Sequence, residues 1–151
     1  MASALYTPEI LRLATQIPHL ARLKGPVTSL ERRAPLCGSW IAVDVVLDSD
    51  GRVADFGQEV RACALGQASA SLMGREILGR SGEELGKVAK NLVLWLKGEG
   101  EMPDWPGLCV FEAARGYPGR HGAISLPFEA IDAAVQLASG RKTVSGRSAQ
   151  I

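Results

Sequence analysis

The sequence predicts an α+β fold, in which helices cover a small antiparallel β-sheet of about three strands. Residues 41–47 place four β-preferring side chains on one face by strict alternation. An Asp-Ser-Asp-Gly turn then leads into a second extended run over residues 52–61. Apolar residues at helical spacing follow in separate stretches further along the chain. A hairpin followed by helices is typical of this fold class.

The chain before the hairpin supplies one helix and one further extended segment. A helix is predicted over residues 8–17, because Thr7 can cap it and Pro8 suits its first position. After a Gly-Pro break the chain is extended up to a tight loop over residues 34–38. Cys37 therefore lies in a loop that enters the hairpin.

Helices are predicted after the hairpin. The first begins at or near Cys63 and is rich in small residues, which suits close packing on the sheet. A Ser-Gly-Glu-Glu capping box opens a helix that ends near Gly98, a short helical turn is expected over residues 109–114, and a final helix starts at residues 126–129 and runs to Leu137. The residues expected to face inward are Leu65, Ala68, Leu72, Ile77 and Leu78 on the first helix and Leu85, Val88, Leu92 and Trp95 on the second.

Composition fits one domain over residues 1–138, followed by a polar tail over residues 139–151 that we expect to be disordered. The formal net charge is +1, which provides no field for gripping nucleic acid. The sequence has no apolar stretch long enough for a membrane span and no secretory leader pattern. We therefore expect a cytoplasmic protein that binds neither nucleic acid nor membrane.

The cysteines are candidates for metal or sulfur chemistry. Three are present, with no Cys-x-x-Cys pair, and a reducing compartment would keep them as thiols. A short hairpin can bring Cys37 and Cys63 together, and the helix N-terminus makes Cys63 the expected reactive thiol. A tetrahedral metal site needs two further donors. The candidates for these are Cys109, His121, His19, Asp44 and Asp104.

Several segments between Leu5 and Ala138 resemble the U-type iron–sulfur cluster assembly scaffolds, namely IscU, SufU and the N-terminal domain of NifU. The segments that carry the resemblance are Leu36-Cys37-Gly38, the Asp50-Gly51 turn, Arg61-Ala62-Cys63 with the Ala/Ser-rich stretch after it, and Tyr117-Pro118-Gly119-Arg120 with Leu126-Pro127-Phe128. The resemblance implies a SufE/NifU-like fold and an iron–sulfur cluster or zinc as the bound group.

The resemblance also implies roles for individual residues. Family members hold the cluster or zinc with three cysteines and an aspartate or histidine. Cys37 matches the first cysteine and Cys63 the second, which would accept persulfide sulfur. Ser39 stands where the family has an aspartate, and the favoured register places Ala123 at the third cysteine. In that register His121 is the substitute third ligand.

Other readings of the same residues remain open. Cys109 is the alternative third ligand, with a gap in the register before the final helix. Arg61 is expected to share a face with the reactive thiol, and Arg115 with Arg120 forms a candidate basic docking patch.

The expected function is a non-enzymatic scaffold or sulfur acceptor that works with a cysteine desulfurase and cluster-receiving proteins, as a monomer or weak dimer. The alternatives are a zinc-dependent sulfur-transfer module, a metal-free fold-mate that docks partners, and a thiol enzyme with Cys63 as nucleophile and His121 as base.

Overall fold

The computed structural model describes residues 5–140. In these residues a three-stranded sheet with strand order β1-β2-β3 is joined to α-helices and 3₁₀ helices, as the sequence predicts. In chain order the elements are α1 (Pro8–Ala14), β1 (Thr28–Arg33), β2 (Trp40–Leu47), β3 (Val53–Arg61), α2 (Ala64–Arg75), α3 (Gly82–Leu96), the 3₁₀ helices η2 (Leu108–Gly116) and η3 (Pro118–Arg120), and α4 (His121–Ala138).

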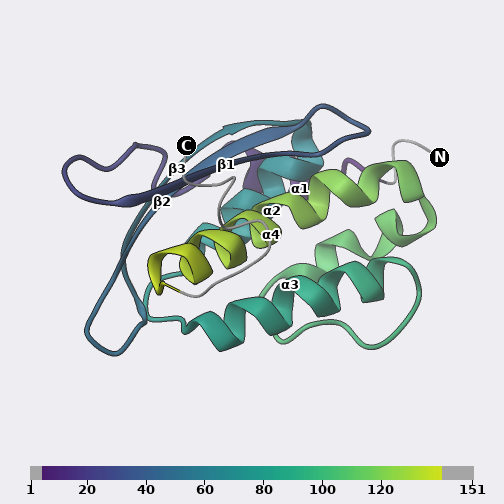
Figure 1. Ribbon diagram of the computed structural model, residues 1–151. Helices are drawn as coiled ribbons and strands as arrows, with labels where there is room; N and C mark the ends of the chain where they lie inside the picture. The colour runs from purple at the N-terminus through teal and green to yellow at the C-terminus, as the bar shows by residue number, and fades with distance from the viewer. Residues whose placement is uncertain (1–4, 141–151) are drawn as a thin grey trace.

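The elements form layers. Figure 1 shows α2 and α4 lying against one face of the sheet, with α3 on the far side of α4 from the strands. All strand pairs are antiparallel. The core lies between the sheet and α4 and between α4 and α3, and its largest fully buried side chains include Phe56, Phe111 and Phe128. No helix in residues 5–140 is both long and apolar enough to cross a membrane.

Both faces of the central strand are buried, which the alternation in the sequence does not predict. Ile41, Val43 and Val45 face the helices, as expected, but Asp44 on the opposite face is only 1% exposed. Arg22 and Leu23 lie over that face, since the Arg22 guanidinium and the Leu23 N–H both donate to the Asp44 carboxylate. The segment between α1 and β1 therefore serves as a cover for the second face.

Two predicted helix C-terminal ends are wrong. α1 ends at Ala14 instead of residue 17, because the Thr15 N–H bonds back to Arg12 and a residue that precedes a proline, here Ile17, disfavours helix. α2 ends at Arg75, so helical spacing no longer applies at Leu78, which is 51% exposed instead of inward. The other residues predicted to face inward on α2 and α3, together with Ile77 beyond the end of α2, are buried.

α4 begins five residues earlier than the sequence predicts. The sequence predicts a start at the Leu126-Pro127 pair, with the proline in the first turn, but the helix begins at His121 and Pro127 lies inside it. The turn η3 runs directly into α4, so no capping side chain marks the boundary. Pro127 has no N–H to give to the carbonyl of Ala123, four residues before it. The Ala123 carbonyl oxygen lies instead next to Gly66 of α2.

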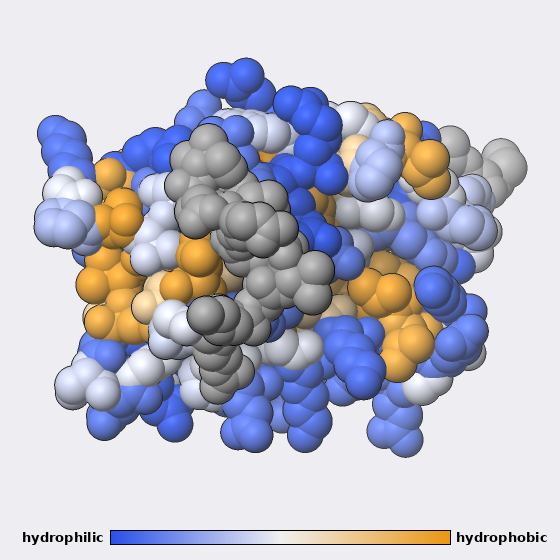
Figure 2. Space-filling model, in the orientation of Figure 1, coloured by the Kyte–Doolittle hydropathy of each residue, from blue (hydrophilic) through white to orange (hydrophobic). Residues whose placement is uncertain are grey.

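The surface is predominantly hydrophilic on the face drawn in Figure 2. Outside the grey atoms, apolar residues gather in separate patches near the two ends of the molecule, with hydrophilic side chains between them. Leu36 is the most exposed large apolar residue of the described chain, at 90%, and it lies in the loop next to Cys37.

Candidate functional site

Cys37 and Cys63, the two cysteines predicted to act together, lie at the same end of the sheet. The register pairs Trp40 at the start of β2 with Arg33 at the end of β1 and with Arg61 at the end of β3. The loop that carries Cys37 joins β1 to β2, and Cys63 follows directly after β3. The hairpin therefore brings both cysteines to the same end of the sheet, as the sequence predicts.

Cys37 lies in a tight loop closed by backbone hydrogen bonds. Ala34 N–H donates to the Ser39 carbonyl at 2.8 Å, and Gly38 N–H donates to the Ala34 carbonyl at 3.1 Å. Gly38 has a φ of +73°, a conformation that favours glycine. The Cys37 thiol is exposed and donates to Ser39 Oγ at 3.2 Å. Ser39, which the resemblance places at the family's aspartate position, is only 3% exposed, and its hydroxyl accepts the hydrogen bond from this thiol.

Cys63 is the N-cap residue of α2, as predicted. Its side chain makes no capping hydrogen bond, and the first turn of α2 has no acidic residue. The helix beyond it lies close to α4, because a Cβ on Gly66 would stand 2.7 Å from Ala62 Cβ and 3.3 Å from the Ala123 carbonyl oxygen. Glycine is therefore needed at this crossing.

A cavity of about 270 Å³ lies between the Cys37 loop and the N-terminus of α2. It is lined by Cys37, Gly38, Ser39, Arg61, Ala62, Cys63, Gly119, Arg120 and Ala123. The residue expected at the third cysteine position is thus a wall of the cavity, but its side chain is a methyl group and is 1% exposed. Apart from the two cysteines, the polar side chains among the lining residues belong to Arg61, Arg120 and Ser39.

His121 does not line this cavity. It is the first residue of α4 and not part of a glycine-rich loop, and its Nε2 lies 3.1 Å from the carbonyl oxygens of both Ala114 and Arg115. An N–H at Nε2 can satisfy these two acceptors at the end of η2. In this arrangement the imidazole ties η2 to α4.

The remaining candidate donors also lie elsewhere. Cys109 is exposed on η2 and is absent from the cavity wall. His19 stacks edge-on against Phe56, and Asp44 is held by hydrogen bonds from the segment that covers the sheet. Asp104 borders a different pocket. Within residues 5–140 no group of three or more His, Cys, Asp or Glu side chains is placed to hold a metal ion.

Arg120 is the residue whose place in the site the sequence did not predict. Its spacing suggested a docking patch with Arg115, but Arg115 donates to the Trp95 carbonyl at 2.9 Å and stacks on the Trp95 ring. Arg120 instead lines the thiol cavity. Its distance of three residues from Ala123 is the signal that could have indicated this, because the turn η3 leads straight into the helix.

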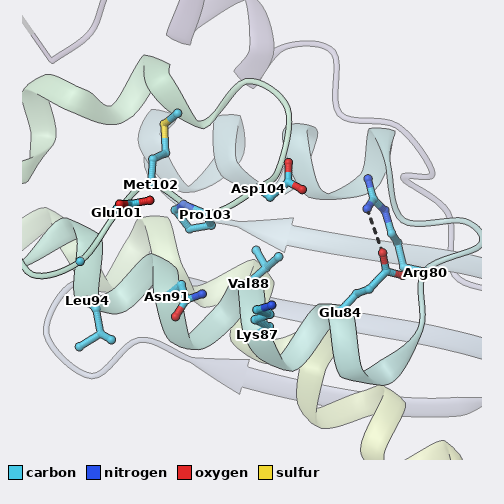
Figure 3. A pocket seen from close by; sticks show the side chains of 11 residues that line it. Arg80, Glu84, Lys87, Val88, Asn91, Leu94, Glu101, Met102, Pro103 and Asp104 are labelled. Atoms are coloured by element: carbon cyan, nitrogen blue, oxygen red, sulfur yellow. Dashed lines mark hydrogen bonds and ion pairs between the residues drawn. The ribbon is translucent and has the colours of Figure 1, made fainter.

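A second and larger cavity, of about 420 Å³, lies between α3 and the loop that follows it (Figure 3). An ion pair between Arg80 and Glu84 closes one end, with Nη1 and Oε2 3.5 Å apart. The lining residues are Arg80, Glu84, Lys87, Val88, Asn91, Leu94, Gly100, Glu101, Met102, Pro103 and Asp104. None is a cysteine or histidine, so this cavity is separate from the thiol chemistry.

Comparison with solved structures identifies the fold. The N-terminal part of a nitrogen-fixing NifU-like protein from Brucella abortus is 31% identical to this chain, with a TM-score of 0.86. The match covers 93% of this chain and 99% of the other. The chain belongs to the U-type, NifU-like scaffold family.

A more distant structure shares the fold. It is described as a putative iron–sulfur cluster assembly scaffold for the SUF system, SufU, from Fervidobacterium islandicum AW-1. It is 20% identical with a TM-score of 0.78, and the match covers 89% of this chain and 99% of that one. No protein-family model matches the sequence, and no curated protein sequence matches it. Membership in the U-type family thus rests on structure together with the identity to the NifU-like domain.

Proposed function

We propose that this U-type protein takes part in iron–sulfur cluster assembly as a sulfur-accepting scaffold, with Cys63 as the acceptor and Cys37 as its partner thiol. The observation that carries the proposal is that both thiols line one open cavity at the end of the sheet. A cysteine desulfurase would supply the sulfur, and cluster-receiving proteins would take the product. Three free cysteines suit a reducing compartment, so a cytoplasmic location is part of the proposal.

Iron, zinc or a cluster would be cargo at the same two thiols. Thiolates bind these metals, but zinc sites and cubane clusters commonly use four protein donors, and the cavity supplies two. His121 and Cys109, the two predicted alternatives for the third ligand, lie outside the cavity wall. We therefore propose that the missing donors come from another molecule, either a second copy of the chain or a receiving protein.

A second candidate function is a metal-free subunit that docks partners. The observation that favours it is the buried methyl group of Ala123 at the position where the resemblance places a cysteine. In that case the thiols would be dispensable, and the exposed Leu36, next to Cys37 in the chain, would serve as an apolar contact.

Sulfur transfer under anaerobic conditions tests the proposal. Reduced wild-type protein is mixed with a purified cysteine desulfurase and free cysteine, and persulfide is located by mass spectrometry. Iron, zinc and acid-labile sulfide are then measured after reconstitution. The variants are Cys37→Ser, Cys63→Ser and, as a matched control with another exposed thiol, Cys109→Ser.

The proposal predicts persulfide on the wild type and on Cys109→Ser but none on Cys63→Ser at that position. It also predicts that Cys37→Ser and Cys63→Ser each lose bound metal and that Cys109→Ser retains it. Equal sulfur loading of Cys63→Ser and wild type would contradict the proposal. If every cysteine variant behaved like the wild type in both measurements, the result would favour the docking subunit.

A further inference from the structure

The thiol cavity has a positive wall. Arg61 and Arg120 line it, and no carboxylate or imidazole is among the residues around it. The guanidinium of Arg61 stacks over the Trp40 ring at 4.9 Å and lies 3.3 Å from Glu59 Oε2, which steadies it at the rim. Within the described chain Arg120 forms no ion pair with an acidic side chain. Of the two arginines that line the cavity, Arg120 is thus the one without a paired carboxylate among the described residues.

This charge favours anions over metal cations. A divalent cation would gain two sulfur ligands but would enter a cavity lined by two cationic residues, and like charges repel. An anion would meet the same guanidinium groups favourably. The donor set of this cavity therefore does not fit a complete metal site within one chain.

The N-terminus of α2 also favours an anion in this cavity. Cys63 is its N-cap and leaves the first backbone N–H groups without a side-chain acceptor. Such groups, together with the positive end of a 12-residue helix, attract an anion. The cavity volume of about 270 Å³ lies below the usual range for drug-sized ligands, so it suits a small oxyanion.

We propose that this cavity binds small anionic sulfane-sulfur donors, the class to which thiosulfate belongs, and that Cys63 takes sulfur from them directly. The inference rests on the proposed function, because it assigns a second source of sulfur to the same acceptor. Arg120 would hold the oxyanion end of the donor, with Arg61 at the rim. The outer sulfur would then face Cys63.

The transfer needs no oxidant or reductant. The Cys63 thiolate, whose proton has passed to solvent, forms a bond to the outer sulfur of thiosulfate. The sulfur–sulfur bond of thiosulfate breaks, and its electron pair leaves with sulfite. The products are a deprotonated persulfide on Cys63 and a sulfite dianion, so atoms and charge balance.

The test uses thiosulfate as the probe. Reduced full-length protein is incubated anaerobically with thiosulfate, and the rate of sulfite release and the persulfide on Cys63 are measured. Arg120→Gln removes the uncompensated charge, Arg12→Gln on the exposed side of α1 is the matched control, and Cys63→Ser removes the acceptor. A parallel arm supplies sulfur from a cysteine desulfurase and free cysteine.

We expect one added sulfur per chain on Cys63 and none at that position in Cys63→Ser. Loss of one charge-assisted hydrogen bond to the donor should slow Arg120→Gln by about tenfold or more, while Arg12→Gln keeps the wild-type rate. Raising the ionic strength should also slow the wild type.

The outcomes separate the two proposals. Loading by the desulfurase but not by thiosulfate would overturn the anion site and leave the proposed function standing. Equal thiosulfate rates in Arg120→Gln and Arg12→Gln would also overturn the anion site. If neither thiosulfate nor the desulfurase loads Cys63, both the anion site and the proposed function are overturned. Loading by thiosulfate alone would support the anion site and contradict the role of a desulfurase.

Discussion

Replacing Asp44 by asparagine should destabilise the protein markedly, because this carboxylate fastens the cover over the second face of the sheet. Asp44 is 1% exposed and accepts hydrogen bonds from Arg22 Nε at 2.8 Å, from Arg22 Nη2 at 3.0 Å, from Leu23 N–H at 2.9 Å and from Ser29 Oγ. An asparagine here would place an N–H₂ group among donors and leave at least one of them unpaired.

The magnitude follows from the partners. Hydrogen bonds from Leu23 and Ser29 to a charged acceptor are worth about 1.5 kcal/mol each at the lower end of their range. Arg22 is 42% exposed and stays within 3.5 Å of Glu59, so its share of the loss is small after solvent screening. We expect a loss of about 2–3 kcal/mol in the free energy of unfolding at neutral pH.

The effect should depend on pH. Burial raises the pKa of Asp44. The hydrogen bonds from Arg22, Ser29 and the Leu23 N–H together lower it by more, so the net pKa lies below its usual value. A carboxyl with a lowered folded pKa stabilises the protein above its unfolded pKa of about 3.9 and loses that contribution as the pH falls through the folded pKa. The advantage of the wild type over Asp44→Asn should therefore be full near neutral pH and shrink below about pH 4.

Urea unfolding at several pH values measures this difference. The matched control is Asp50→Asn, at an exposed position of the turn between β2 and β3, which should change the stability by less than about 0.5 kcal/mol. An Asp44→Asn protein as stable as the wild type near neutral pH would refute the role given to this carboxylate. A difference in the free energy of unfolding between wild type and Asp44→Asn that grows as the pH falls would refute the predicted direction of the pH dependence.

The other predictions concern the packing around the site. Gly66→Ala should lower the free energy of unfolding by about 1–3 kcal/mol, since the new Cβ meets the Ala62 side chain, whereas Gly116→Ala has open space and should be neutral by the same urea titration. His121→Ala removes the imidazole from the carbonyls of η2 and should cost about 1 kcal/mol in thermal unfolding without changing metal content. Phe111→Ala, at a fully buried position, should cost about 3–5 kcal/mol in the same assay.

The hairpin and the helices after it could be predicted because their signals are local. Ser81 and Glu84 form the predicted capping box, with both reciprocal hydrogen bonds present. The position of Cys63 at the N-terminus of α2 also follows from the end of a strand pattern and the beginning of a small-residue run. These features depend on neighbours within a few residues, so the sequence alone carries them.

The cover over the sheet could not be predicted in this way. The pair formed by Arg22 and Asp44 joins residues 22 positions apart, and neither belongs to a pattern that announces the other. α4 begins before the predicted start, because Pro127 normally favours a first turn but lies inside this helix, which packs against β1, β2, α2 and α3. Long-range contacts decide both cases.

The candidate site was predicted in part. The spacing of Cys37 and Cys63 around a hairpin, together with the family resemblance, brings them to one place, and the structure has both on one cavity wall. Linear distance from Ala123 predicts His121 as the third ligand only if residues 119–122 form a loop. In a helix, two residues of separation point side chains in different directions, and the imidazole faces η2 instead.

The most direct test of the central claim is whether Cys37 and Cys63 act as one dithiol. A monosubstituted trivalent arsenical bonds two neighbouring thiols at once, so reduced protein is titrated with phenylarsine oxide and the bound arsenic and remaining thiols are counted by mass spectrometry. We predict one arsenic per chain with Cys109 still free, and no stable adduct in Cys37→Ser or Cys63→Ser. An adduct that persists in those variants, or none in the wild type, would contradict the shared site.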